Sequence, residues 1–275
     1  MTLREILDMG TKYLHDSGID EAQLQARQLL EFVFEINRSY YFVHSDDIIE
    51  GEKSEQYQAL LKRRAMREPL QYITQEAYFM GHRFFVNGDV LIPRFDTEIL
   101  VAKVSEIIKA GDSILDMCTG SGCIAIALAL EHSNVQVEAV DISDKALAVA
   151  RRNAKDLKAE VVFKESDLFE KVMKQYDIIV SNPPYIRSAV IEELMEEVQG
   201  HEPWLALDGD EDGLKFYRQI VAKAKDFLRK EGFLAFEIGH NQGDEVSAIM
   251  TEANYYHIRV IKDLAGLDRV VIGQR

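Results

Sequence analysis

The sequence predicts a doubly wound α/β domain with a mostly parallel sheet, preceded by a small helical bundle and a β-hairpin connector. Three observations predict it: apolar residues at helical spacing in the first quarter of the chain, a short strand-rich stretch after them, and strands alternating with helices in the remainder. The 275 residues suit one large domain or one medium domain with a small companion. We place a helical domain at 1–70, the connector at 71–93 and the α/β domain at 94–275.

The first segment is predicted to be helical because its apolar side chains recur every three or four residues. Gly10, Gly18 and Gly51 punctuate it and suggest three or four separate helices, the last of which ends before Pro69. The apolar positions are Ile6, Leu7, Tyr13, Leu14, Leu24, Leu29, Leu30, Phe32, Val33 and Phe34.

The connector is predicted from a change of period, because aromatic and β-branched residues replace the helical pattern. Gly81-His82 and Asn87-Gly88 are turn signals between these residues. The strand-type positions are Tyr72, Ile73, Tyr78, Phe79, Phe84, Phe85 and Val86.

The α/β domain is expected to contain seven strands, of which the last two form an antiparallel pair. The expected strands are 113–117, 135–140, 160–163, 177–181, 232–238, 257–262 and 269–273, and helices are expected at 123–131 and 144–157. Ligands of such sheets bind at the carboxyl ends of the strands.

A glycine turn after the first strand of this sheet is the first candidate binding site. Gly120 and Gly122 let the backbone turn sharply and approach a ligand, while Ala125 is small enough for the helix to pack on the strand. The G-x-G-x-x-A pattern is typical of adenosine ligands and does not by itself distinguish dinucleotides from the others.

Two carboxylates follow the next two strands. Asp141 ends the second strand, where its oxygens can accept hydrogen bonds from both ribose hydroxyls; its alternative role is that of a helix cap. Asp167 ends the third strand, where it can accept from an adenine amino group while Leu168 packs on the ring. Both acids are therefore expected beside the glycine turn.

The segment Asn182-Pro183-Pro184-Tyr185, at the end of the fourth strand, is the candidate catalytic site. Both prolines fix φ and hold the preceding residue extended, so the loop is stiff. Its alternative interpretation is a simple turn, but its position after a strand and downstream of Asp141 favours catalysis. Tyr185 offers an aromatic face on which a flat group can stack.

The acceptors of this loop suit a planar NH2 group, whose nitrogen is a poor nucleophile because its lone pair is delocalised. We expect the side-chain oxygen of Asn182 and the carbonyl of Pro183 to accept its two hydrogens. This orients the group and favours the pyramidal, partly positive nitrogen of the transition state. The pattern predicts methyl transfer from S-adenosylmethionine.

Composition excludes several other classes of function. The formal net charge of −15 disfavours nucleic acid as a partner, because such binding depends on neutralising phosphates with Lys and Arg. Cys118 and Cys123 match no zinc or disulfide pattern, so we expect no metal site and interpret both as reduced packing residues. Without a membrane-spanning apolar run or a secretory leader pattern, we expect a cytoplasmic protein without membrane contact.

At these residues the chain resembles the release-factor glutamine methyltransferases, the PrmC/HemK family, over nearly its whole length. The most specific shared features are the helical N-terminal domain and the segment Pro93-Arg94 with Asp96-Thr97-Glu98; the Asn182 loop is shared with adenine and other amino-methyltransferases. One departure is Phe95, where the family usually has proline. Further shared segments are 116–125, 202–207 and 237–243.

The resemblance implies a Rossmann-like, seven-stranded class I methyltransferase domain that uses S-adenosylmethionine. Its substrate would be the glutamine of the Gly-Gly-Gln loop in bacterial class I peptide-chain release factors, gripped by the helical domain at 1–70. The glutamine would be held by residues 182–185. The implied cofactor contacts are Cys118, Thr119, Gly120, Ser121, Gly122, Asp141, Leu168 and Asn182.

Two other interpretations remain open at the level of sequence. An adenine-N6 methyltransferase of nucleic acid shares the Asn182 loop but is expected to carry a basic face. A dehydrogenase-like or non-catalytic adenosine-binding protein accounts for the glycine turn and Asp141 but gives the Asn182 loop no purpose.

Overall fold

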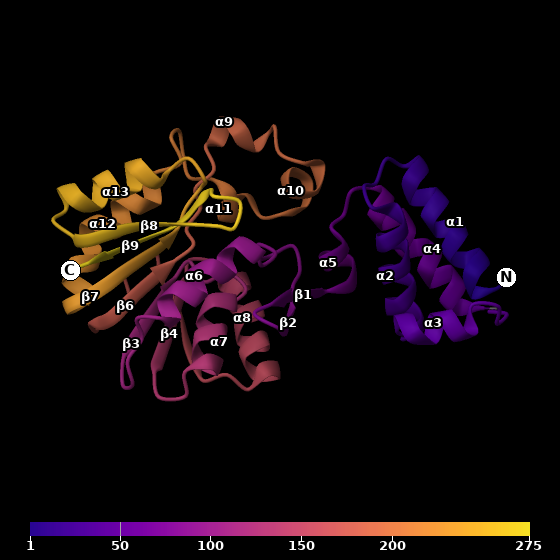
Figure 1. Ribbon diagram of the computed structural model, residues 1–275, viewed down its shortest axis with the longest axis horizontal. Coiled ribbons are helices and arrows are strands. Elements are labelled where there is room, and N and C mark those ends of the chain that lie inside the picture. Colours follow the sequence, from indigo (N-terminus) through magenta and orange to yellow (C-terminus); the bar gives the residue numbers. More distant parts are fainter. Residues whose placement is uncertain (50) are drawn as a thin grey trace. The chain divides into compact units, whose positions relative to one another are not determined.

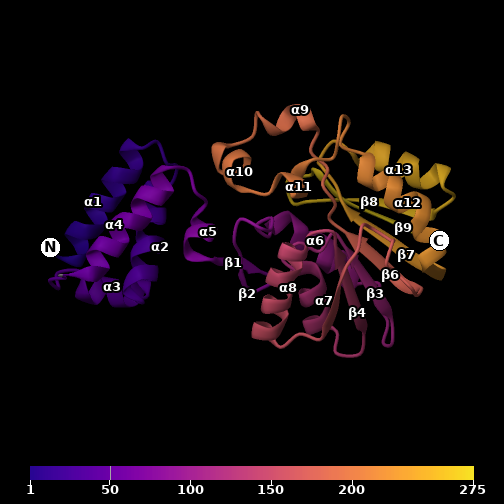
Figure 2. The ribbon, with the colours of Figure 1, turned by 180° about the vertical axis from the view of Figure 1, so that it is seen from behind.

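The computed structural model describes residues 1–49 and 51–275, which form two compact units. The helical unit consists of Met1–Gln75 and Met195–His201, and the α/β unit of Glu76–Leu194 and Glu202–Arg275. Figures 1 and 2 show their elements from opposite sides. Within the described ranges, no helix is both long enough and apolar enough to cross a membrane.

The helical unit is built around one apolar core. A capping box begins its first helix, since the Thr2 hydroxyl accepts from the Glu5 amide and the Glu5 carboxylate accepts from the Thr2 amide. The first helices end in αL residues or tight turns, and their inward faces fill the core. The unit contains α1 (Leu3–Asp16), α2 (Ala22–Phe34), α3 (Arg38–His44), α4 (Glu52–Ala65) and the short α5 (Leu70–Thr74).

Gly10 does not separate two helices, so that interpretation was wrong. It lies inside α1, where the ring of Tyr57 from α4 packs directly against its backbone and leaves no room for a Cβ. Tyr57 is fully buried and donates from its hydroxyl to the carbonyl of Ala26 on α2 at 3.0 Å. The glycine thus allows a close contact among three helices.

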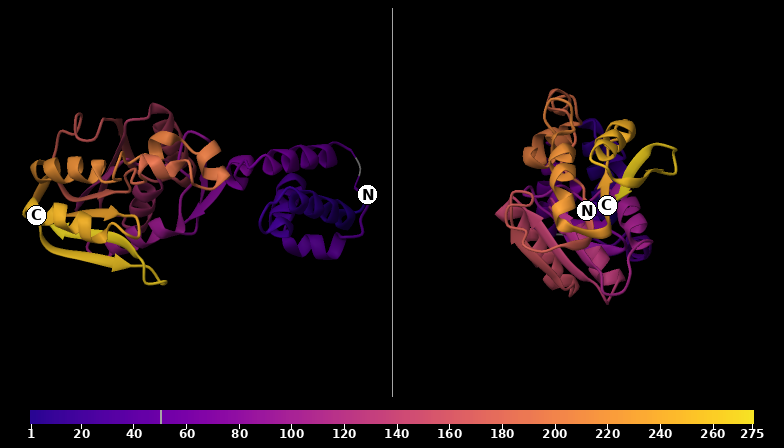
Figure 3. Two further views of the ribbon diagram at one scale, coloured as in Figure 1. Left: turned by 90° about the horizontal axis from the view of Figure 1, so that it is seen from above. Right: turned by 90° about the vertical axis from the view of Figure 1, so that its left-hand side faces the viewer.

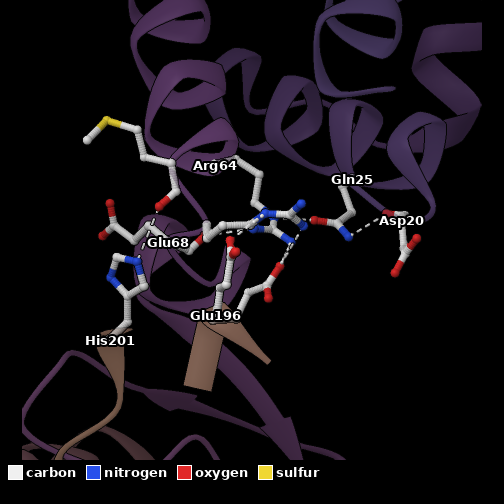
Figure 4. Close-up of polar contacts among 9 residues, drawn as sticks. Asp20, Gln25, Arg64, Glu68, Glu196 and His201 are labelled. Carbon is white, nitrogen blue, oxygen red and sulfur yellow. Dashed lines mark hydrogen bonds and ion pairs between the residues drawn. The ribbon is translucent and has the colours of Figure 1, made fainter. Parts of the chain in front are cut away.

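The segment Met195–His201 belongs to the helical unit although it is distant in sequence. Its helix α10 (Glu196–His201) is held by ion pairs of Arg64 with Glu197 (2.9 Å) and of Arg67 with Glu196 (3.2 Å). Arg64 is 5% exposed and also donates to the side-chain oxygen of Gln25. Figure 4 shows the side chains of Gln25, Arg64 and Glu196 converging. Periodicity in the first 70 residues does not predict this contribution.

The α/β unit contains the predicted seven-stranded sheet, in the order β5-β4-β3-β6-β7-β9-β8. The first five strands are parallel, and β9 is antiparallel to both β7 and β8, as expected for the last pair. The β8–β9 hairpin, yellow in Figure 3, forms one edge of the sheet. The strands are β3 (Ser113–Met117), β4 (Gln136–Asp141), β5 (Val161–Glu165), β6 (Tyr176–Ser181), β7 (Leu228–Glu237), β8 (Tyr256–Lys262) and β9 (Asp268–Gln274).

Helices cover both faces of this sheet, as the continuous burial of its central strands requires. Alternate strand residues enter two different cores: Ile114 packs with one group of helices, and Leu115 with the other. The first group contains α6 (Phe95–Ser105), α7 (Cys123–Glu131) and α8 (Asp144–Leu157), and the second α12 (Lys215–Phe227) and α13 (Gly243–Glu252), as Figure 1 shows. The short α9 (Ser188–Ile191) and α11 (Trp204–Leu207) follow β6.

The predicted hairpin is present as β1 (Glu76–Phe79) and β2 (His82–Phe85), with the turn at residues 80–81. Phe79 and Phe84 are buried and pack against the α6–α7 side of the α/β core. Tyr72 and Ile73 were wrongly interpreted as strand residues, because they lie in α5 and Ile73 enters the core of the helical unit.

Candidate active site

A cavity lies at the carboxyl ends of β3, β4, β5 and β6, the edge of the sheet at which the sequence predicts ligand binding. Nine of the predicted site residues line it: Cys118, Thr119, Gly120, Ser121, Asp141, Asp167, Leu168, Asn182 and Pro184. The residues predicted for the site that do not line it are Gly122, Pro183 and Tyr185.

The glycine turn has the backbone that its sequence predicts. Gly120 and Gly122 have φ values of 53° and 81°, and Cys118 adopts 62°. A Cβ on Gly122 would lie 3.0 Å from the Cβ of Ala150 on α8, so this glycine serves close helix packing and not the cavity wall.

Asp116, on β3 beneath the turn, holds the turn from within. Its Oδ2 accepts from the Thr119 hydroxyl at 2.5 Å and from the amide of Ala125 at 3.2 Å. Burial raises the pKa of Asp116 to about 7, against the effect of these hydrogen bonds. This residue was not predicted as part of the site, although its place immediately before the turn is a usable signal.

Asp141 is bound to the glycine turn. Its Oδ2 accepts from the amide of Gly120 at 2.8 Å, and its Oδ1 accepts from the amide of Ser143 at 2.9 Å. The cap of α8 is Ser143, whose hydroxyl accepts from the amide of Ala146. Burial raises the pKa of Asp141 even though the backbone amides of Ser143, Gly120 and Ile142 lower it. A carboxylate has four acceptor positions, so Asp141 retains capacity for a ligand.

Asp167 and Leu168 lie in the turn after β5, which ends at Glu165, two residues beyond the expected strand 160–163; Asp167 therefore follows the strand and does not end it. Leu168 has a φ of 46°, and its carbonyl accepts from the hydroxyl of Ser166 at 2.8 Å. Both predicted side chains therefore reach the cavity from a turn whose conformation is fixed by a local hydrogen bond.

The Asn182 loop begins where Ser181 donates to the carbonyl of Met117 at 2.7 Å, which joins the ends of β6 and β3. Asn182 donates from Nδ2 to the hydroxyl of Thr97 on α6 at 3.3 Å. Its amide nitrogen is thereby engaged, and Oδ1 remains as the acceptor for a group in the cavity.

Tyr185 turns away from the cavity wall. Its hydroxyl donates to Oε1 of Glu237, at the end of β7, at 3.3 Å, and its ring packs beside the α12–α13 core. Burial raises the pKa of Glu237 to about 7. The stacking role of Tyr185 and the acceptor role of Pro183 stay predictions.

Several lining residues were not predicted for the site. Arg94 and Thr97 line the cavity, and Arg94 contacts both carboxylate oxygens of the buried Glu202, at 2.6 and 2.7 Å. Burial raises the pKa of Glu202, although Arg94 opposes the shift. Residues 203, 205 and 206 follow this ion pair along the cavity wall. The sequence signal for these residues is that Arg94 and Glu202 lie in segments shared with the resembled family.

Two known domain families match this chain. The PrmC N-terminal domain family matches residues 5–74, and the methyltransferase small domain family matches residues 94–200. The release factor glutamine methyltransferase of Geobacter sulfurreducens is 40% identical over 274 residues, covering 99% of this chain and 96% of that protein. The enzyme of the same name from Clostridium acetobutylicum is 40% identical over 283 residues, covering 100% of this chain and 99% of that protein.

Solved structures support the fold. A methyltransferase from Pyrococcus furiosus superposes with a TM-score of 0.55 at 16% identity, covering 81% of this chain and 98% of that one. A Thermus thermophilus 16S rRNA methyltransferase superposes with a TM-score of 0.53 at 16% identity, covering 73% of this chain and 49% of that one. The full-length relatives confirm the resemblance predicted from the sequence: the chain belongs to the release factor glutamine methyltransferase family.

Proposed function

We propose that this protein methylates the side-chain amide nitrogen of the glutamine in the Gly-Gly-Gln loop of bacterial class I peptide-chain release factors, using S-adenosylmethionine. One observation carries the proposal most directly. The amide nitrogen of Asn182 is engaged by Thr97, so its side-chain oxygen is the atom left for a donor in the cavity. A glutamine NH2 is such a donor.

The residues around the glycine turn fit S-adenosylmethionine, which supplies an electrophilic methyl on a positively charged sulfur. Asp141 would accept from the ribose hydroxyls, and Asp167 would accept from the adenine amino group. Leu168 and the exposed side chain of Ile142 supply apolar surface for the base. The acidic character of this part of the cavity also suits a cationic ligand.

The Asn182 loop would orient the glutamine for attack. With one N–H held by Asn182 and the other by the carbonyl of Pro183, the lone pair can face the methyl group. The nitrogen becomes acidic only as the new bond forms, so no strong base is needed before attack. The loop therefore acts by positioning and by favouring the developing charge.

We further propose that the helical unit recognises the release factor. The catalytic and cofactor residues proposed above all belong to the α/β unit. The helical unit instead carries exposed apolar side chains on α3, among them Tyr40, Phe42 and Val43, which are typical of protein contacts.

The test is incubation of the protein with labelled S-adenosylmethionine and a full-length release factor, followed by peptide mass spectrometry. We expect one methyl group on the Gly-Gly-Gln glutamine and none on a Gln→Glu release factor, because glutamate presents no N–H to Asn182. DNA and RNA, supplied in parallel, should remain unlabelled. Labelled adenine with an unlabelled release factor would refute the proposed substrate while leaving methyl transfer intact.

A further inference from the structure

The end of β7 and the segment that follows it lie against the Asn182 loop, and they have been given no role in the proposed reaction. It contains two buried polar side chains, Glu237 and Gln242, which are 2% and 8% exposed. Both contact Tyr185, the last residue of the loop. Neither belongs to the described residues that line the cavity, so they reach the loop from its other side.

Gln242 holds the main chain of the loop. Its Nε2 donates to the carbonyl of Tyr185 at 3.1 Å and to the carbonyl of Gly213 at 3.2 Å. Its Oε1 accepts from the amide of Gly239 at 2.9 Å. Two carbonyls can only accept and the amide can only donate, so the orientation of the Gln242 side chain is unique.

Two glycines, Gly209 and Gly213, make room for the contact between Gln242 and Tyr185. A Cβ on Gly213 would overlap the carbonyl oxygen of Tyr185 and lie 2.9 Å from Nε2 of Gln242. A Cβ on Gly209 would lie 2.8 Å from the Cα of Tyr185. Two glycines therefore let the backbone close around Tyr185, and a larger residue at either position would displace it.

Glu237 holds the other end of the same residue. Its Oε1 accepts from the phenol hydroxyl of Tyr185 at 3.3 Å. Its main-chain carbonyl accepts from the hydroxyl of Tyr217 on α12 at 2.9 Å, which fixes the end of β7. Tyr185 is thus bound at its carbonyl by one side chain and at its hydroxyl by another.

We infer that Gln242 and Glu237 are positioning residues that fix Tyr185 at both ends and thereby hold the Asn182–Tyr185 loop in place for methyl transfer. The inference rests on the proposed function, because it takes this loop to be the catalytic one. Neither side chain is among the described residues that line the cavity. Each acts through Tyr185, with the two prolines transmitting the constraint to Asn182 because their φ angles are fixed.

The decisive variant is Gln242→Glu, which keeps size and shape but replaces the Nε2 donor by an oxygen facing two carbonyls. We expect kcat for release-factor methylation to fall on the order of 10- to 100-fold, because small displacements of a positioned group have effects of that size. S-adenosylmethionine affinity should remain within about threefold, since a factor of that size is under 1 kcal/mol. Gln219→Glu, the same change at an exposed position on α12, is the matched control.

Glu237 is tested by a double-mutant cycle with Tyr185. If Glu237 acts through the phenol hydroxyl, Glu237→Gln and Tyr185→Phe should each lower kcat, and the double variant should be no slower than the slower single variant. Additive losses would show that Glu237 acts elsewhere and would overturn its part of the inference.

Amide hydrogen exchange of the segment 182–187, followed without substrate, provides a measurement that does not depend on activity. Exchange should rise on the order of tenfold in Gln242→Glu and stay unchanged in Gln219→Glu. Unchanged exchange, or a kcat loss matched by an equal loss of cofactor affinity, would overturn the inference. A wild-type protein that leaves release factors unmethylated would refute the proposed function alone, because the exchange measurement still tests the positioning role.

Discussion

Single polar side chains in the site have their orientation set by partners on other elements. Asp141 accepts from the backbone of the glycine turn, and Asn182 donates to Thr97 across 85 positions of sequence. An oriented acceptor loses less freedom when it binds a ligand, which is why such contacts favour both affinity and rate. The three predictions that follow concern residues of this kind.

Replacing Asp141 by alanine should weaken S-adenosylmethionine binding by about 1.5 to 3 kcal/mol, because charge-assisted hydrogen bonds to the ribose are lost. Isothermal titration calorimetry measures the change. Asp144→Ala is the control, since this side chain is 78% exposed on the same helix start. Equal affinities of the two variants would leave Asp141 with only its contact to the glycine turn.

Asn182→Ala should lower the single-turnover rate of methylation. The transition state should lose at least about 3 kcal/mol of stabilisation, which is the effect of removing one oriented hydrogen-bonding group. Cofactor affinity should change far less, because the side chain mainly holds the substrate NH2. Both quantities can be measured on one preparation, with the exposed Asn241→Ala as control. A rate within about threefold of wild type would contradict the assignment.

Glu237 should make the protein less stable as pH rises from about 5 to 7. Burial raises the pKa of Glu237 in the folded protein to about 7, against an ordinary value of 4.5, despite the opposing effects of Thr97, Tyr185 and Arg269. Between pH 4.5 and about 7 the Glu237 carboxyl keeps its proton in the folded state but loses it in the unfolded state. Its contribution to the free energy of unfolding is therefore complete below pH 4.5 and is lost as the pH rises toward about 7.

The measurement is urea unfolding at several pH values for wild type and Glu237→Gln. The difference in unfolding free energy between the two should change by up to about 1.4 kcal/mol per pH unit in that window. Glu245→Gln, at an exposed position of α13, should leave the wild-type pH dependence unaltered. If the unfolding free energies of wild type and Glu237→Gln changed with pH in parallel, the Glu237 carboxyl would not retain its proton in the folded state.

At the scale of elements, the β1–β2 hairpin is fastened to the cofactor turn by one asparagine. Asn153 on α8 is 1% exposed; it accepts from the amide of Phe85 at 2.7 Å and donates to the carbonyls of Phe85 and Ser121, both at 3.0 Å. The Asn153 side chain therefore pairs with both backbone groups of Phe85, as a neighbouring strand would. It also holds the carbonyl of Ser121, which lines the cavity.

Asn153→Ala should lower the free energy of unfolding by about 2 to 4 kcal/mol, because buried backbone groups of Phe85 and Ser121 lose their partner. Chemical denaturation measures this, with the exposed Asn134→Ala as control. S-adenosylmethionine affinity should fall as well, since Ser121 loses its support. A loss of stability without any loss of affinity would separate the hairpin from the cofactor site.

The elements that the sequence predicts well are those whose pattern is local. Helices α7 and α8 have the expected bounds, 123–131 and 144–157, because each follows a strand and a turn with clear signals. The five-residue α5 was missed because it is too short to show a helical period. The docking of α10 on the helical unit was missed because no local pattern marks a contact between Arg64 and Glu197.

The same distinction applies to the candidate site. Asp141 and Asn182 could be predicted because both follow parallel strands, and the ends of such strands meet at one edge. Thr97 and Arg94 come from the start of α6, and Gln242 comes from the start of α13. Their partners are distant in sequence, so only the folded chain shows which atoms they hold.

At the scale of the whole molecule, the division into two units makes a prediction about substrate size. A variant lacking residues 1–75 should bind S-adenosylmethionine within about threefold of wild type and methylate a Gly-Gly-Gln peptide at a similar rate. Its kcat/KM for an intact release factor should fall more than about tenfold, because the proposed recognition unit is gone.

This variant should also carry Glu196→Gln and Glu197→Gln, since both acids lose their arginine partners when the first 75 residues are removed. The control is the full-length protein with the same two substitutions. Steady-state methylation of peptide and protein substrates measures the outcome. A truncated variant with full activity on the intact release factor would refute the recognition role of the helical unit.

Residues 195–201 belong to the helical unit, so no single cut in the chain separates the two units completely. A protease nick after residue 75 would leave the second fragment still carrying α10, whose ion pairs with Arg64 and Arg67 would favour association of the two fragments. Co-expressed as separate polypeptides, they should reconstitute. The first fragment made by itself would lack α10, so Arg64 would lose its acidic partner Glu197 and become more accessible to water.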